Sequence, residues 1–128
     1  MDKKSVTKKL RVDEENTACA MGSGSLMVLA TPAVVALMEN AAAELAQNIL
    51  GDDELTTVGT MISIEHISPT PIGAEVSATA VLTKNEGRSF CFDVFASDSC
   101  GEIAHGTHQR VSVNAEKFQE KADGKLND

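Results

Sequence analysis

The sequence predicts an α+β domain in which one long apolar helix lies against a single antiparallel sheet of five strands. One observation is the stretch from Thr31 to Leu50, which consists mainly of Ala, Val, Leu, Ile and Met. The other is a series of segments after it in which apolar and polar residues alternate, as along a strand with one buried face. Hairpin-like turns join the later segments, which indicates antiparallel pairing. A helix packed on such a sheet is typical of α+β domains.

A strand is predicted wherever apolar residues recur at every second position, because they then share one face of a sheet. One such segment precedes the helix and four follow it. Along the second strand the pattern places Val58, Ile62 and Ile64 on one face, and along the fourth it places Phe92 and Val94 inward. The predicted strands are residues 6–12, 57–67, 75–83, 90–96 and 103–113.

The long helix has recognisable ends. Thr31 can cap free backbone amides, and Pro32 suits the first turn because its missing N–H would have no partner there. Gly51 is typical of the residue just beyond a helix C-terminus. Residues 19–25, before the helix, are small and contain glycine, which predicts a loop. The helix should expose only a narrow polar stripe and bury the rest. That stripe is Asn40, Glu44, Gln47 and Asn48.

Length and composition narrow the class of protein. The chain has 128 residues, of which 42 % are hydrophobic, and this fits one domain with one core, with residues 119–128 expected to be a frayed tail. The net charge of −8 and the absence of Trp and Tyr argue against nucleic acid and anionic membrane surfaces as partners. No apolar run approaches the length of a membrane span, and no signal peptide is recognisable. Three scattered cysteines favour a reducing, cytoplasmic location.

Two ionisable residues lie where apolar ones are expected. Glu39 is about 125° from the centre of the polar stripe, so it should point toward the sheet or a partner subunit. A structural ion pair and a catalytic carboxylate explain this placement about equally well. His66 shares its strand face with Ile62 and Ile64, just before a proline ends the strand. A histidine there suits proton transfer near neutral pH, although a hydrogen-bonded core histidine is the commoner case.

Thr31 and Gly59 are weaker candidates. The Thr31 hydroxyl could act as a helix cap or could reach a bound carbonyl, and the free amides of the helix N-terminus could hold an oxyanion. Gly59 lies inside a strand, where glycine indicates either a bulge or the close approach of a ligand.

The remaining motifs exclude other chemistry. His105 and His108 are three positions apart on one strand, so they should point to opposite faces and form a poor chelating pair. We therefore predict no metal site. The sequence contains neither a phosphate-binding glycine-rich motif followed by Lys and Ser or Thr, nor a Gly-x-Ser-x-Gly elbow.

Five segments are informative when taken together. They are Gly22-Ser-Gly-Ser-Leu26, Ala30-Thr-Pro-Ala-Val-Val-Ala-Leu-Met-Glu39, Thr56-Thr-Val-Gly59 with His66, Thr70-Pro-Ile-Gly73 and Gly106-Thr-His-Gln-Arg110. From about residue 5 to residue 120 the chain resembles the fluoroacetyl-CoA thioesterase type of hotdog protein. That resemblance implies a hotdog fold and a homodimer with its sites at the subunit interface. It also implies that Thr31, Glu39 and His66 are catalytic and that the Gly59 backbone lies near the acyl carbonyl. It makes Arg110 a candidate for contact with CoA, and a solvated strand arginine is an equally good explanation of that residue.

The expected activity is hydrolysis of an acyl-CoA to the carboxylic acid and free CoA, without a cofactor, since CoA is part of the substrate. Residues 21–25 contain no aromatic side chain that could close over a very short acyl group. This favours another short or medium acyl-CoA over fluoroacetyl-CoA. Two alternatives remain: a non-catalytic acyl-CoA binding module, and a hotdog hydratase or dehydratase, which also uses a carboxylate and a histidine.

Overall fold

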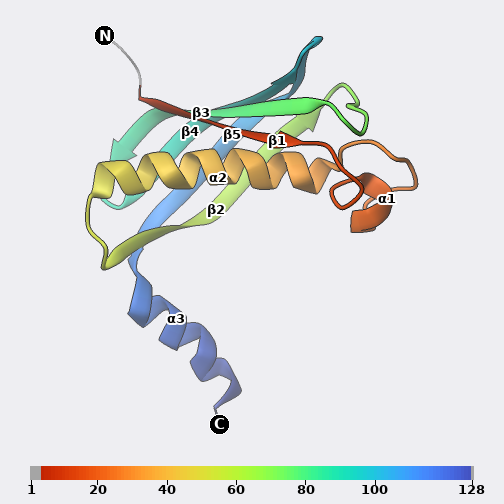
Figure 1. Ribbon diagram of the computed structural model, residues 1–128. Helices are drawn as coiled ribbons and strands as arrows, with labels where there is room; N and C mark the ends of the chain where they lie inside the picture. Colours follow the sequence, from red (N-terminus) through yellow and green to blue (C-terminus); the bar gives the residue numbers. More distant parts are fainter. Residues whose placement is uncertain (1–3, 128) are drawn as a thin grey trace.

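The predicted α+β architecture is confirmed by the computed structural model, which describes residues 4–127. Five strands form one antiparallel sheet in the order β1-β3-β4-β5-β2. Helix α2 (Thr31–Leu50) lies along one face of this sheet (Figure 1), and β1 and β2 form its two edges. The strands are β1 (Ser5–Arg11), β2 (Leu55–His66), β3 (Glu75–Glu86), β4 (Ser89–Asp98) and β5 (Gly101–Asn114).

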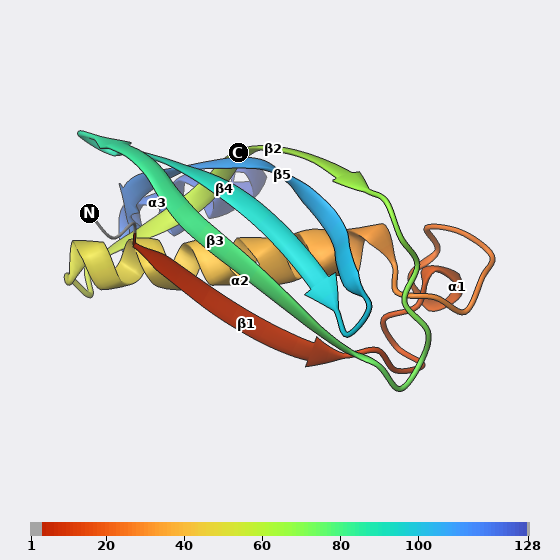
Figure 2. The ribbon, with the colours of Figure 1, turned by 90° about the horizontal axis from the view of Figure 1, so that it is seen from above.

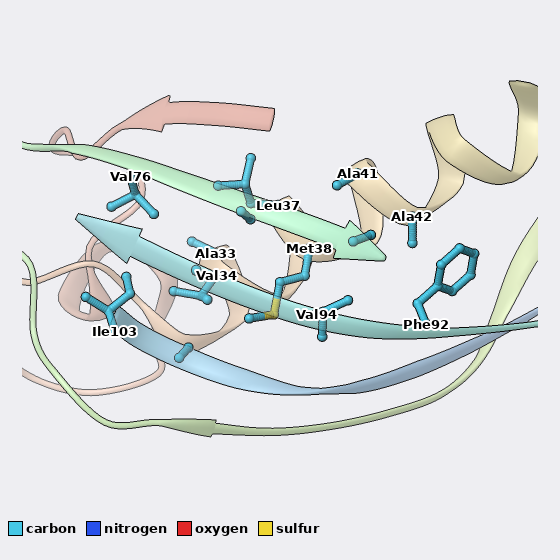
Figure 3. Packing of buried hydrophobic residues seen from close by; sticks show 14 of the residues in the cluster. Ala33, Val34, Leu37, Met38, Ala41, Ala42, Val76, Phe92, Val94 and Ile103 are labelled. Carbon is cyan, nitrogen blue, oxygen red and sulfur yellow. The ribbon is translucent and has the colours of Figure 1, made fainter. Parts of the chain in front are cut away.

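The core lies between α2 and the concave face of the sheet. Seen from above, the strands cross the helix at an angle and curve around it (Figure 2). Phe92 and Val94 are each only 1 % exposed, as predicted, and they face α2, whose Met38 side chain points toward the sheet (Figure 3). Alanines on the buried face of α2 let the helix approach the sheet closely. The buried helical residues are Ala33, Val34, Leu37, Met38, Ala41, Ala42, Leu45 and Ala46.

The C-terminus of α2 agrees with the prediction, whereas its N-terminus differs. Gly51 ends the helix in a left-handed conformation, with φ of 58°, and its N–H donates to the Gln47 carbonyl, as predicted. The cap at the N-terminus, however, is Ala30, and Thr31 is already helical. The prediction that Thr31 caps the helix is therefore wrong, and its hydroxyl is free for another partner.

The exposed face of α2 is wider than predicted. Besides the polar stripe, Ala36 is exposed and Val35, Glu39 and Ala43 are only half-buried. The expectation that everything outside the stripe would be buried is wrong for a single chain. The apolar residues Val35, Ala36 and Ala43 form an apolar strip on α2. Such a strip, beside a free sheet edge, is typical of a surface that a second subunit covers.

A bulge in β2 changes which residues share a face. Gly59 pairs with Arg110 and Met61 pairs with Gln109, so Thr60 is the extra residue. A bulge reverses the alternation beyond it, and Gly59 therefore shares a face with Ile62 and Ile64. The prediction that Val58 shares that face is wrong, because strict alternation ignores the extra residue.

Two short helices appear where none was predicted. Helix α1 (Ala18–Met21) forms part of the predicted loop, and its first amides are capped by Thr17. Helix α3 (Ala115–Asp123) follows β5 and projects from the domain, and a 3₁₀ turn, η1 (Gly124–Leu126), ends it (Figure 1). The Asn114 side chain accepts from the Lys117 N–H and starts α3. No helix within residues 4–127 is long and apolar enough to cross a membrane.

Candidate active site

The predicted site residues fall into two groups, one at the C-terminal end of β2 and the other around Gly59, near the bulge in β2. Thr31 is in the first turn of α2 and His66 is the last residue of β2. Thr31 Oγ1 and His66 Nδ1 are 2.8 Å apart and hydrogen-bonded. The structure thus joins these two predicted residues, and the hydroxyl that does not cap the helix is held by the imidazole instead.

The second nitrogen of His66 has no partner. Nε2 is buried, and it is the one buried side-chain N or O within residues 4–127 that makes no hydrogen bond. Leaving a buried polar atom unpaired costs about 1–3 kcal/mol. Such an atom in a native protein needs an explanation, and a group supplied by a substrate or a partner subunit provides one.

A small pocket opens beside this pair. Its volume is about 290 Å³, and Val28, Leu29, Ile67 and Pro69 contribute apolar walls next to Thr31 and His66. The segments that border it pair with each other, since Val28 forms a β-bridge with Pro71. Large apolar side chains are exposed on these segments. They are Met21, Leu26, Met27, Ile67 and Ile72.

The second group surrounds Gly59. A Cβ placed on Gly59 would lie 3.3 Å from Oε2 of Glu39, 3.2 Å from Cε1 of His108 and 3.6 Å from a terminal nitrogen of Arg110. Glu39, on α2, is half-buried, as its position off the polar stripe predicted. Within residues 4–127 nothing hydrogen-bonds to its carboxylate. Of the two explanations for Gly59, the bulge applies, because Gly59 adjoins it. The missing side chain also lets three side chains converge.

Arg110 is anchored within the chain and is not a solvated strand arginine. Its Nε donates to Thr57 Oγ1 at 2.8 Å, and one terminal nitrogen donates to the Thr57 carbonyl at 2.9 Å. The other terminal nitrogen is 3.2 Å from Nε2 of His108. Burial lowers the pKa of the guanidinium, and the nearby Glu39 carboxylate opposes that effect.

His108 is a functional candidate that sequence reasoning missed. It is fully buried, and its Nδ1 lies 2.8 Å from the Met61 carbonyl oxygen. Burial lowers the pKa of His108; the Met61 hydrogen bond raises it, Arg110 lowers it and Glu39 raises it to lesser extents. The sequence alone marks this residue only as a possible metal ligand. Its shared strand face with Arg110 is the signal that could have identified it.

An open cleft of about 740 Å³ runs along this second group, between α2 and β2. Glu39, Gly59 and Arg110 line it, together with Thr57 and Gln47. The predicted substrate-binding residues therefore share one cleft with the predicted catalytic carboxylate.

One chain does not bring all three predicted catalytic residues together. Thr31 and Glu39 are eight residues apart on α2, which is about 12 Å along the helix axis. Gly59 and His66 are separated along β2 by about 20 Å. Glu39 of one chain is therefore out of hydrogen-bonding reach of His66 in the same chain.

The histidines of β5 point to opposite faces, as predicted. His105 lies on the outer face, where its ring nitrogens are 3.3 Å from Glu65 and 3.2 Å from Glu102, whereas His108 faces α2. Within the part of the chain that the structure describes, no group of three His, Cys, Asp or Glu side chains could hold a metal ion.

Comparisons with known proteins identify the family. Residues 12–116 match the family described as fluoroacetyl-CoA-specific thioesterase. The chain belongs to this family. It is 39 % identical over 94 residues to the fluoroacetyl-CoA thioesterase of Streptantibioticus cattleyicolor, covering 73 % of this chain and 67 % of that protein.

Solved structures agree with this assignment. A solved structure of the fluoroacetyl-CoA thioesterase FlK has a TM-score of 0.88 at 30 % identity, covering 98 % of this chain and 96 % of that one. A structure of an FlK mutant in complex with fluoroacetate and CoA has a TM-score of 0.84 at 31 % identity, covering 92 % and 98 %. A hot-dog-like protein from Thermanaerovibrio acidaminovorans, at 19 % identity, has a TM-score of 0.86 over 98 % and 93 %. The predicted hotdog fold and family are confirmed.

Proposed function

We propose that this protein is an acyl-CoA thioesterase that acts as a homodimer. The observation that carries the proposal is the Thr31–His66 hydrogen bond, whose imidazole keeps a buried Nε2 without a partner beside an apolar pocket. The reaction adds water to the thioester carbonyl and breaks the C–S bond, which gives a carboxylic acid and free CoA. No cofactor is required, because CoA is part of the substrate.

Each residue would have a distinct role. His66 would act as general base and then as general acid for the departing thiolate, with Thr31 orienting its ring. Glu39 would attack the carbonyl or orient the attacking water, and the absence of in-chain hydrogen bonds to its carboxylate leaves it available for either. The Gly59 N–H of one chain and the N-terminus of the partner's α2 would together stabilise the oxyanion.

A homodimer would unite the two groups. β2 is an edge strand, and edge strands readily pair with another chain. Antiparallel pairing about a two-fold axis at Ser63, with the bulge residue Thr60 skipped, would place Gly59 opposite His66 of the partner subunit. Glu39, which adjoins Gly59, would then approach the unpaired Nε2 of the partner's His66. The same contact would cover the apolar strip on α2.

Arg110 would contact the bound CoA ester. The chain carries a net charge of −8, so an anionic ligand needs local positive charge. Arg110 supplies it in the cleft, where two of its N–H groups remain free of in-chain acceptors. We propose the cytoplasm as the location, where the free thiols of Cys19, Cys91 and Cys100 would stay reduced.

The acyl group would be short or medium in length and not specifically fluoroacetyl. The pocket beside Thr31 is bordered by exposed apolar side chains, and the loop at residues 21–25 has no aromatic residue to close it. We expect activity on acetyl- or fluoroacetyl-CoA not to exceed that on a longer or branched acyl-CoA.

A thiol-release assay across a panel of acyl-CoAs tests the activity. Turnover with release of free CoA supports the proposal, and a strong preference for fluoroacetyl-CoA would contradict the proposed acyl range. Binding of CoA esters without turnover would make the protein a binding module. Water addition to an enoyl-CoA without thiol release would make it a hydratase.

Light scattering tests the assembly. A mass of twice 13.5 kDa, or a multiple of that, is expected at micromolar concentration. A monomer would contradict a site shared between subunits.

A further inference from the structure

His108 is the one fully buried ionisable side chain within residues 4–127, and the proposed reaction does not use it. Its ring lies against Phe92, with centroids 6.1 Å apart and planes inclined by 28°. A buried histidine is costly unless both ring nitrogens are paired, and here both are. The two hydrogen-bond partners of His108 therefore indicate its role.

The hydrogen bonds fix the protonation state of the ring. The Met61 carbonyl can only accept, so Nδ1 must donate to it. The Arg110 guanidinium can only donate, so Nε2 must accept from it. His108 is thus a neutral imidazole with its proton on Nδ1, and burial favours the same state by lowering its pKa.

Arg110 is held from two sides as a result. Thr57 accepts from Nε and from one terminal nitrogen, while His108 accepts from the other. Of the five guanidinium N–H groups, one on each terminal nitrogen remains free. With no side chain on Gly59 between them, the guanidinium lies beside Glu39.

We propose that His108 is a positioning residue, which holds the Arg110 guanidinium beside Glu39 so that its free N–H groups point into the cleft. The inference rests on the proposed thioesterase function, which supplies the activity to be measured. Arginine has many rotamers, and fixing it before substrate arrives lowers the entropic cost of ordering it on binding. Protonation of His108 would remove the acceptor and place two cations side by side.

Two substitutions separate the two hydrogen bonds of His108. In His108→Asn the shorter amide reaches the position of Nδ1 and can keep the Met61 bond, but it cannot reach Arg110. In His108→Gln the longer amide reaches the position of Nε2 and can keep the bond from Arg110. We expect His108→Asn to lower kcat/KM by on the order of 10-fold or more, and His108→Gln to lower it clearly less.

A double-mutant cycle tests whether His108 acts through Arg110. Arg110→Ala should raise KM, and adding His108→Asn to it should cost little more, because there is no guanidinium left to position. Additive losses, or equal kcat/KM for His108→Asn and His108→Gln per folded molecule, would overturn the proposal. His105→Gln, on the outer face of the same strand, is the matched control and should keep wild-type kinetics.

A second readout separates this inference from the proposed function. The Arg110 Nε–H resonance can be followed by nitrogen-15 NMR without substrate. Its hydrogen exchange should be slow in the wild type and in His108→Gln and faster in His108→Asn. If acyl-CoAs are not hydrolysed but this pattern is seen, the thioesterase function fails and the positioning of Arg110 stands. Equal exchange in all three proteins would refute the positioning itself.

Discussion

The two ends of β2 differ in how completely one chain builds them. At the Gly59 end, Thr57, Arg110 and His108 form a continuous hydrogen-bonded network that ends on the Met61 carbonyl. At the His66 end there is one hydrogen bond, to Thr31, and a buried nitrogen that lacks a second.

This difference shows which part of the site is preorganised within a chain. The Gly59 end fixes a cation and has a carboxylate beside an open cleft, but it contains no histidine available for general acid–base catalysis near neutral pH, since His108 is buried and already paired. The His66 end contains such a group and has no carboxylate to pair with it. Each end has what the other lacks, which is expected if an active site forms from two chains.

Removing either residue of the proposed catalytic pair, Glu39 or His66, should have the largest effect on turnover. His66→Ala and Glu39→Gln should each lower kcat by on the order of 100-fold or more, the scale of a lost acid–base group. The double variant should be little worse than the worse single variant, because the two residues act as one unit. Turnover is measured by thiol release on the best acyl-CoA of the panel.

Melting temperatures of the same three variants provide the control. If Glu39 and His66 were purely structural, kcat per folded molecule would stay near normal and the melting temperature would fall. Normal turnover in either single variant would remove that residue from the mechanism.

Subunit mixing tests whether the two ends come from different chains. A hybrid of one His66→Ala chain and one Glu39→Gln chain, isolated with two affinity tags, should have about half of wild-type activity, because one of its two sites is intact. The parent variants would each remain near background.

The reciprocal hybrid is the matched control. It pairs a wild-type chain with a chain carrying both substitutions, and it should be inactive, since each site then lacks one residue. The opposite result, an active reciprocal hybrid and an inactive mixed one, would place the whole site within a single chain.

Much of the fold could be predicted because it depends on local patterns. Apolar alternation identified all five strands, and the composition of residues 31–50 identified α2. The bulge at Thr60 could not be foreseen, because an extra residue is defined only by its pairing with β5. Helix α3 was missed because none of its residues is buried and no apolar core face marks it.

The site was predictable residue by residue but not as an assembly. Glu39 and His66 were identified because each interrupts an apolar pattern. The role of His108 depends on an acceptor far from it in sequence, the Met61 carbonyl, and on a donor two residues away, the Arg110 guanidinium. Strand parity places a side chain on a face and does not tell which atoms it will meet there.

A substitution at Gly59 would disturb the Gly59 end of β2, which one chain already preorganises. In Gly59→Ala the new methyl group would press on Glu39 and His108 at distances shorter than ordinary van der Waals contact. We expect kcat/KM to fall by roughly 10-fold as these groups shift. Because Gly59 lies in a strand, where alanine costs little backbone strain, the melting temperature should change little.

A substitution in another strand shows whether this loss is specific. Ser97→Ala, on the inner strand β4 and exposed, should leave both kcat/KM and melting temperature unchanged. Wild-type kinetics in Gly59→Ala would mean that the convergence of side chains at Gly59 has no role in the reaction.

The smallest expected effect concerns the protonation of His108 and how it changes stability with pH. In an unfolded chain the pKa of a histidine is about 6.5, and burial holds that of His108 lower in the folded chain, with Arg110 and Glu39 as the charged groups that face it. Between these two values the unfolded chain binds more protons, so stability rises with pH across this window and is lost as the pH falls below about 6.5. From pH 7 to about pH 5.5 the wild type should therefore lose more in melting temperature than His108→Gln. His66 and His105 are present in both proteins, so their contributions cancel when the two are compared at one protein concentration. Parallel melting curves across this range would show that the folded chain accepts a proton on His108 as readily as the unfolded chain, and that the imidazole is not held neutral between Met61 and Arg110.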